Sequence, residues 1–223
     1  MLKKLCILFL TIILVVGIGS TAGATLMFED TVAGGVGSAE WDLVDVDGVS
    51  WEIKIDNTSP TTLIGDIGIN SPGITGLGFD LEQGDLGISS WSLQADDSGG
   101  TLLTIGGSGS STGDWALGAG SGDVVLDFNA STTSGSSGAL YNPLAISGFG
   151  GPPHYFTEAI LSITWDSDAS LIAESAFVRM QNVGLDGDGS LKMNPVPEPA
   201  TMFLLGTGLI SLAGFGRKRF FKN

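Results

Sequence analysis

The sequence predicts an all-β domain with an antiparallel β-sandwich or jelly-roll-like fold, and three observations support this. Segments in which apolar and polar residues alternate recur between residues 25 and 195, and such alternation is typical of half-buried strands. Apolar residues at helical spacing are scarce in the same interval. Of the 35 glycines in the chain, 28 fall there and divide the alternating segments into short pieces.

The clearest segment is Ser50–Asn57, in which Trp51, Ile53 and Ile55 share one face and charged residues share the other. Similar alternation occurs in Ile88–Gln94, Ala159–Trp165 and Ser175–Gln181. Shorter candidate strands are Thr25–Phe28, Thr61–Ile69, Ile74–Leu81, Thr101–Ile105 and Asp123–Phe128. Between them lie stretches rich in Gly, Ser, Asp and Pro, the residues that favour turns. About nine or ten short strands separated in this way predict two antiparallel sheets packed together.

The N-terminus has the three parts of a secretory signal peptide. Lys3 and Lys4 precede the apolar run Leu5–Ile18, which predicts a signal helix, and small residues follow it. Ala22 and Ala24 form an A-x-A cleavage site, so we expect residues 1–24 to be removed. The apolar run is shorter than the roughly 20 residues that span a bilayer permanently, but an uncleaved anchor is the alternative.

The composition changes abruptly at Pro195, which separates a domain at 25–194 from a C-terminal segment at 195–223. Pro197, Glu198 and Pro199 are stiff and extended, because proline fixes its own φ and restricts the residue before it. The following run, Ala200–Gly216, is apolar and uncharged, which predicts a transmembrane helix.

A basic stop ends this run, formed by Arg217, Lys218 and Arg219. The positive-inside rule places such residues on the cytoplasmic side of the membrane. The alternative is that this segment is an ordinary C-terminal membrane anchor in which Pro-Glu-Pro occurs by chance.

The order V-P-E-P-A-T, LLGTGL and R-K-R closely resembles the PEP-CTERM sorting signal. The resemblance implies that an exosortase, a membrane-embedded cysteine transpeptidase of Gram-negative bacteria, recognises Val196, Pro197, Glu198 and Pro199 and cuts nearby. It implies export by the secretion machinery, transient residence in the inner membrane, and delivery to the cell surface or extracellular matrix. It also implies a setting in which exopolysaccharide is produced.

The charge of the chain is strongly segregated. Residues 25–195 contain 23 of the 24 acidic residues but only three basic ones, Lys54, Arg179 and Lys192, so this interval has a net charge of −20. Phosphate binding depends on Lys and Arg, so we exclude nucleic acid as a partner. A high negative charge is typical of the surface of a soluble exported protein. The more specific alternative is that the acidic residues bind divalent cations.

No residue pattern predicts catalysis. His154 is the single histidine and lies in a Pro-Gly stretch, and no G-x-S-x-G nucleophile motif accompanies it. The only cysteine, Cys6, lies in the predicted signal peptide, so neither zinc ligands nor a cysteine nucleophile is expected in the domain. Paired carboxylates could serve a glycoside hydrolase, but with so many acids such pairs have no discriminating power. We therefore expect no enzyme and no cofactor.

Calcium is the best-motivated ligand among the metals. Asp42, Asp45 and Asp47 lie before a glycine, as do Asp186 and Asp188 in an Asp-Gly-Asp-Gly sequence. Calcium takes six to eight hard oxygens from alternating loop positions. Neither stretch completes an EF-hand loop, and Asp-Gly is also an ordinary turn signal. These residues therefore predict either ordinary turns, which are favoured, or a calcium site.

The five tryptophans are candidates for stacking on sugars: Trp41, Trp51, Trp91, Trp115 and Trp165. Trp51, Trp91 and Trp165 lie on the apolar faces of predicted strands, which favours core packing. Trp115 follows a Ser-Gly stretch and is expected to be the most exposed of the five, although burial is favoured even there.

These observations predict an exported structural or adhesive protein without enzymatic activity. The first alternative is a carbohydrate-binding module that uses Trp115 and acidic loops, assisted by calcium and directed at exopolysaccharide. The second alternative is a polysaccharide hydrolase.

Overall fold

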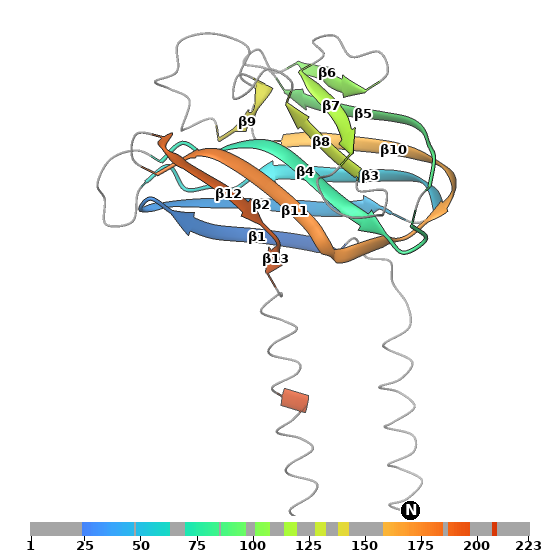
Figure 1. Ribbon diagram of the computed structural model, residues 1–223, viewed down its shortest axis with the longest axis horizontal. Coiled ribbons are helices and arrows are strands. Elements are labelled where there is room, and N and C mark those ends of the chain that lie inside the picture. Colours follow the sequence, from blue (N-terminus) through green and yellow to red (C-terminus); the bar gives the residue numbers. More distant parts are fainter. Residues whose placement is uncertain are drawn as a thin grey trace, which may run out of the picture.

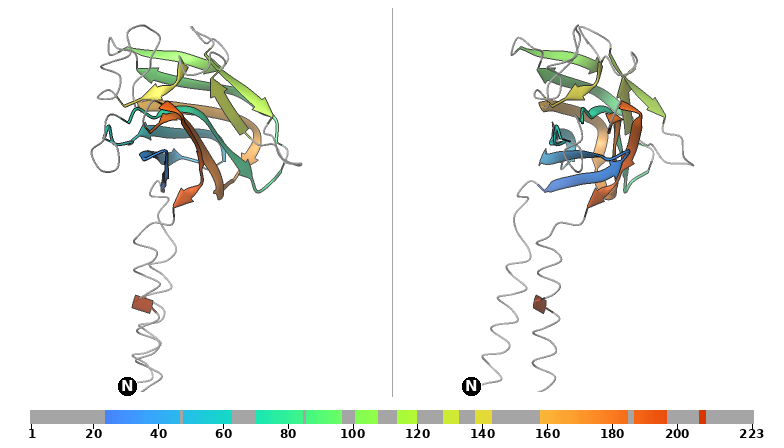
Figure 2. Two further views of the ribbon diagram at one scale, coloured as in Figure 1. Left: turned by 60° about the vertical axis from the view of Figure 1, so that its left-hand side comes forward. Right: turned by 90° about the vertical axis from the view of Figure 1, so that its left-hand side faces the viewer.

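The computed structural model describes most of the predicted domain. The described residues are 24–46, 48–62, 70–84, 86–96, 101–107, 114–119, 128–132, 138–142, 158–184, 187–196 and 207–208. They form an antiparallel β-sandwich, and the prediction of a mostly β fold with two packed sheets is confirmed. The two layers can be followed in Figure 2. Both predicted terminal helices lie outside the described residues, apart from residues 207 and 208.

The first sheet has the strand order β6-β5-β10-β3-β2-β1-β13. Its strands are β1 (Thr25–Val32), β2 (Gly35–Asp45), β3 (Gly48–Asn57), β5 (Ile88–Asp96), β6 (Leu102–Gly107), β10 (Glu158–Ala169) and β13 (Pro195–Val196). The second sheet has the order β12-β11-β4-β8-β7, and β9 also pairs with β4. Its strands are β4 (Gly73–Leu81), β7 (Trp115–Ala119), β8 (Phe128–Thr132), β9 (Leu140–Tyr141), β11 (Leu171–Val183) and β12 (Gly189–Met193). Figure 1 shows β12 and β11 at the front.

The two sheets are joined along one edge by a parallel contact between β6 and β7, in which Gly106 lies opposite Trp115. A Cβ atom at Gly106 would lie 2.7 Å from the Cβ of Trp115 and 2.9 Å from the indole of Trp91. Gly106 therefore leaves the space in which the strand of one layer meets the strand of the other. At the opposite end of the strand order, β12 belongs to the second sheet and β13 to the first.

The alternation that predicted the strands also places their side chains. Ile53 on β3, Leu161 on β10 and Leu93 on β5 lie directly opposite one another, and all three are buried. The residues that flank them point to solvent, because successive side chains of a strand lie on opposite faces. Each of these strands thus contributes an apolar row to the core and a polar row to the outer surface.

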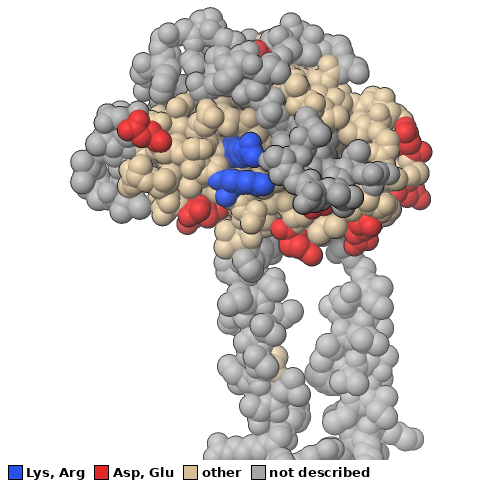
Figure 3. Space-filling model, viewed as in Figure 1, with Lys and Arg blue, Asp and Glu red and all other residues tan. Residues whose placement is uncertain are grey.

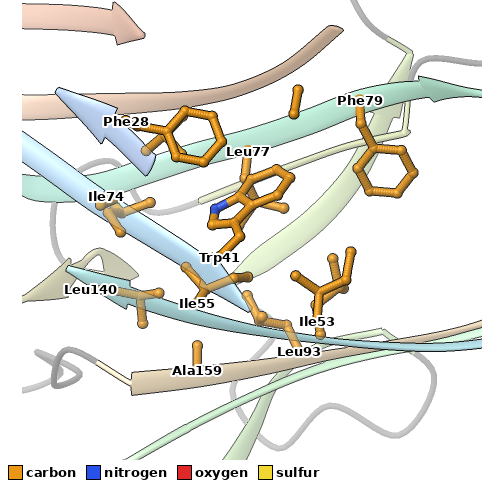
Figure 4. Close-up of a cluster of buried hydrophobic side chains, with 14 of the residues drawn as sticks. Phe28, Trp41, Ile53, Ile55, Ile74, Leu77, Phe79, Leu93, Leu140 and Ala159 are labelled. Atoms are coloured by element: carbon orange, nitrogen blue, oxygen red, sulfur yellow. The ribbon is translucent and has the colours of Figure 1, made fainter. Parts of the chain in front are cut away.

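Aromatic side chains from both layers meet in the core. Trp41 of β2 lies at the centre of the buried cluster in Figure 4, with its ring 5.0 Å from that of Phe28 and 6.4 Å from that of Phe79. Trp51 packs edge-on against Trp165 with 5.1 Å between ring centroids. Such aromatic pairs contribute about 0.5–1.5 kcal/mol each beyond the burial of their surface. The core therefore holds the two sheets together.

A buried asparagine adds a polar tie between the layers. Asn57, the last residue of β3, donates from Nδ2 to the carbonyl oxygens of Pro72 at 2.9 Å and Leu140 at 2.8 Å. Its Oδ1 accepts from the backbone N–H of Ser59 at 3.1 Å. Leu140 belongs to the second sheet, so one side chain links the end of β3 to the opposite layer.

Several strands escaped the sequence prediction. The largest is β2, in which Ala39, Trp41 and Leu43 point inward although the sequence around them is rich in glycine and aspartate. Strands β7, β9, β12 and β13 were also missed, and β10 and β11 extend beyond their predicted bounds. Most of the predicted strand Thr61–Ile69 and residues 123–127 lie outside the described residues.

Candidate functional site: the C-terminal stem and two charged faces

The chain enters its C-terminal segment directly from the β-sandwich. Pro195 and Val196 form β13, which pairs with β1 so that Met27 lies opposite Val196 and Phe28 opposite Pro195. Strand β1 begins at Thr25, one residue after the predicted cleavage site at Ala24. The two ends of the domain therefore leave from neighbouring strands of the first sheet. Because β13 lies after the domain boundary expected at residue 195, its pairing with β1 joins the C-terminal segment to the domain.

A groove of about 450 Å³ lies beside the paired strands β1 and β13, which we name the stem. Met27, Glu29, Glu40 and Val196 contribute to its walls. Met27 and Val196 are 41% and 44% exposed, which is high for apolar residues on paired strands. The stem thus combines exposed apolar and acidic groups.

The outer face of the first sheet has a row of carboxylates on four adjacent strands, named here the acidic row. Glu40 of β2 lies opposite Asp56 of β3, and Asp56 lies opposite Glu158 of β10. Ala159 lies opposite Ala95, which places Asp96 of β5 beside Glu158 in the same register. Like charges directly opposite each other destabilise a sheet. The acidic row is therefore an unfavourable arrangement for the isolated domain.

Lys54 is the one cation beside the acidic row among the described residues. Its Nζ lies 3.0 Å from Glu158 and 3.5 Å from Asp56. The hydrogen bond to Glu158, followed by the charge of Asp56, raises the pKa of Lys54 above its ordinary value. This lysine pairs with two of the four carboxylates and leaves the acidic row negative.

The pKa of Asp56 reflects both its burial and the charges around it. Partial burial raises the pKa of Asp56, the nearby Lys54 opposes that rise, and Glu158 adds to it. One carboxylate oxygen of Asp96, Oδ1, is buried without a hydrogen-bond partner in the described part of the chain. The row would therefore gain from a cationic partner.

The outer face of the second sheet has two positive charges near its β12 edge. Arg179 of β11 and Lys192 of β12 lie directly opposite each other, and we name them the basic pair. Both cover the ring of Phe177, Lys192 with Nζ 4.1 Å from the centroid and Arg179 with Cζ 5.9 Å from it. Figure 3 shows the two side chains together, with the acidic side chains visible in this view around them. Neither forms an ion pair with a described carboxylate.

The predicted calcium ligands do not form one loop. Asp42 lies in strand β2, opposite Lys54, and accepts a hydrogen bond from the Thr25 hydroxyl at 2.8 Å. Asp45 ends the same strand, and Asp188 lies exposed before β12. Asp47, Asp186 and the side chain of Asp45 lie outside the described residues. Within the described residues, no group of three or more His, Cys, Asp or Glu side chains is arranged to hold a metal ion.

The exposure of two tryptophans, Trp115 and Trp91, differs from the order expected from the sequence. Trp115, expected to be the most exposed, is 2% exposed and donates from Nε1 to the Gly138 carbonyl oxygen at 2.8 Å. Trp91 is half-buried at the edge of the core. Only the ranking of Trp115 as the most exposed tryptophan is wrong, because its position at the junction of the two sheets encloses the indole. The favoured alternative, burial, is confirmed there.

Other predicted residues have no described position. His154, the cleavage-site residue Ala22, the motif residues Pro197, Glu198 and Pro199, and the basic stop Arg217, Lys218 and Arg219 are among them. Val196 and Ala24 are described and lie at the ends of the domain. In the described part of the chain, no helix is both long and apolar enough to cross a bilayer.

Comparison with known proteins identifies only the C-terminal segment. Residues 195–219 match the PEP-CTERM protein-sorting motif. No curated protein and no solved structure matches the chain. The matched residues begin at β13, the strand that ends the sandwich. This chain is thus an exported protein that carries a PEP-CTERM sorting motif and is processed by an exosortase for the cell surface.

Proposed function

We propose that the β-sandwich is a structural or adhesive component of the cell surface or of an exopolysaccharide matrix, and that it acts without catalysis. The observation that carries this proposal is the direct passage from β13 into the sorting motif. Because β13 is paired with β1, both ends of the domain lie at one side of the first sheet. The remaining surface of the sandwich can then face outward from the site of attachment.

The packing of the domain supports the same function. Trp41, Phe79 and Trp165 are buried in a continuous apolar cluster that spans both sheets. A core of this kind stabilises the domain, because apolar burial contributes about 25 cal/mol per Å². Such a domain suits a surface component whose outer faces contact other molecules.

The carbohydrate-binding alternative has lost its main support. It relied on Trp115 as an exposed stacking surface, and that indole is enclosed. Trp91 is half-buried and packs against the core cluster. A glycan array probed with the protein tests this alternative separately from the structural function.

Deletion of the gene in the native host tests the structural function. We expect a less cohesive matrix or weaker surface attachment, restored by the wild-type gene. A variant with Pro197→Ala, Glu198→Gln and Pro199→Ala should fail to restore it, because the domain would be made but not sorted. Normal cohesion in the deletion strain would contradict the proposal. Accumulation of uncleaved polysaccharide in that strain would favour the hydrolase instead.

A further inference from the structure

The two outer faces of the sandwich have complementary charges. Among the described residues, the only cations apart from Lys54 are Arg179 and Lys192, and they lie together on the outer face of the second sheet, near its β12 edge. Four carboxylates cross the first sheet in the acidic row. The separation points to a contact in which one face meets the other.

Strand β4 presents glycines beside the basic pair. Gly76 lies opposite Arg179 and Gly78 opposite Phe177, so β4 presents no side chain beside the basic pair. A Cβ atom at Gly76 would lie 3.4 Å from the Cβ of Arg179, so the arginine stem lies against the glycine backbone. Sheets that pack face to face lie about 10 Å apart. The glycines leave room for such an approach.

The spacing of the charges also matches. Arg179 and Lys192 are directly opposite on adjacent strands, as are Glu40 and Asp56, and as are Asp56 and Glu158. Directly opposite residues have Cβ atoms about 4.5–5.5 Å apart in every antiparallel pair. Two cations at this spacing can therefore contact two neighbouring carboxylates at the same time.

We propose that copies of this chain stack face to face, with the basic pair of one copy against the acidic row of the next. The contact is heterologous, because it joins two different faces, and so it can repeat into an open row of copies. It would relieve the repulsion between Glu40, Asp56 and Glu158, and it would give the basic pair carboxylate partners, which it lacks among the described residues. This extends the structural function proposed above by naming a second copy as the partner.

The expected contact is weak in dilute solution. The acidic row crosses four strands about 4.8 Å apart, so it extends about 15 Å across the sheet but only one residue along each strand. A contact centred on it is smaller than the roughly 800 Å² per partner of a standard interface. The high negative charge of both copies also opposes association. Copies sorted to one surface are held at a high effective concentration, which favours even a weak contact. Stacking would thus occur mainly where sorting concentrates the protein.

A charge exchange tests the proposal on the full chain purified in a non-ionic detergent. Sedimentation velocity at low salt and high protein concentration should show reversible association that is at least tenfold weaker at 0.5 M salt, because screening shortens to about 4 Å. The variant Arg179→Glu/Lys192→Glu should remain monomeric, and so should Glu40→Lys/Glu158→Lys. Mixing the two variants should restore association, because each contact again joins opposite charges.

Matched variants separate the two faces from total charge and from the apolar tag. Arg179→Lys/Lys192→Arg keeps the basic pair and should associate like the wild type. Glu82→Lys/Glu174→Lys changes the net charge as much as Glu40→Lys/Glu158→Lys but at exposed sites outside the row, and should still associate. Association that survives both face reversals, or no association of the wild type, would overturn the proposal. Either result would leave the test in the native host unaffected.

A cross-link test does not depend on charge reversal. We expect a full chain with Lys192→Cys to form disulfides with a second chain with Glu158→Cys when both are expressed in the host. Either chain alone should form few, because neither face would meet itself. Glu174→Cys in place of Glu158→Cys is the matched control and should not cross-link to Lys192→Cys. Equal cross-linking in all combinations, or none in the expected pair, would contradict the stacking.

Discussion

Val196 lies directly opposite Met27, so the strand that leads into the sorting motif is paired with the first strand of the domain. Both side chains are on the same face and partly exposed. Opposite residues of an antiparallel pair have Cβ atoms about 4.5–5.5 Å apart, near the range that a disulfide requires. We therefore expect Met27→Cys/Val196→Cys to form an intramolecular disulfide under mild oxidation, detected by mass spectrometry of the proteolysed protein.

Glu29→Cys/Val196→Cys is the control for this register. Glu29 is on the same strand and the same face as Met27 but two residues away, and such diagonal pairs are about 7–8 Å apart. We expect several-fold less disulfide in this control. Similar yields in the two variants would mean that β13 does not keep its register against β1.

The two buried indoles of Trp115 and Trp165 differ in one hydrogen bond. Both side chains are 2% exposed, but Trp115 donates to the Gly138 carbonyl oxygen whereas Nε1 of Trp165 has no partner among the described residues. Replacement of Trp115 by Phe leaves a buried carbonyl unsatisfied, which costs about 1–3 kcal/mol in addition to lost packing. Trp165→Phe also loses packing, but the N–H group that it removes has no partner among the described residues.

We therefore expect Trp115→Phe to lower the free energy of unfolding by about 1–2 kcal/mol more than Trp165→Phe. Urea titrations followed by far-UV circular dichroism measure the two values. A larger loss in Trp165→Phe would show that packing, and not the hydrogen bond, dominates at the two sites.

The alternating pattern of Ser50–Asn57 was sufficient to predict β3 because the segment faces core on one side and solvent on the other. The same rule would have found β2 from Ala39, Trp41 and Leu43. Its start is obscured by glycine and serine, and its aspartates favour ordinary turns, with calcium ligands as the alternative. Local pattern therefore predicted the class of fold but not every strand.

The charged faces could not be predicted from the sequence. Glu40, Asp56 and Glu158 are far apart along the chain and become neighbours only through the pairing of β2, β3 and β10. The burial of Trp115 likewise depends on where the two sheets join, which no local pattern records. The sorting motif was predictable because its signal is contiguous in sequence.

Asn57 should be among the polar residues whose loss most destabilises the domain. Its amide satisfies two carbonyl oxygens and one N–H group, all at the end of β3 and in the opposite layer. Asn57→Ala leaves these buried groups without that partner, and we expect it to lower the free energy of unfolding by about 3 kcal/mol. Gln94→Ala removes a half-buried amide with one 3.5 Å contact to Thr104 and should cost less than about 0.5 kcal/mol. Equal losses in the two variants would contradict the role of Asn57 as a tie between the sheets.

Neutralising Asp56 should raise the free energy of unfolding by an amount that depends on pH, because Asp56 lies among the carboxylates of the acidic row. The pKa of Asp56 is raised above its ordinary value of 3.8, first by burial and further by Glu158, so the folded state binds its proton more tightly than the unfolded state. The stability from this protonation is fully present below 3.8 and is lost as the pH rises through the folded pKa. At pH 7 the ionised carboxylate therefore destabilises the fold.

Asp56→Asn has nearly the same shape as Asp56 but no charge, and Lys54 keeps its 3.0 Å contact with Glu158. We expect this variant to be more stable than the wild type at pH 7 by about 0.2–1 kcal/mol, the range of like-charge pairs across strands. The difference should vanish near pH 3, where Asp56 is protonated in both states. Urea titrations at both pH values measure it, with Glu174→Gln as a control that removes one exposed charge outside the row. A loss of stability in Asp56→Asn at pH 7 would mean that its ion pair with Lys54 outweighs burial and repulsion, and that the acidic row is not a source of strain.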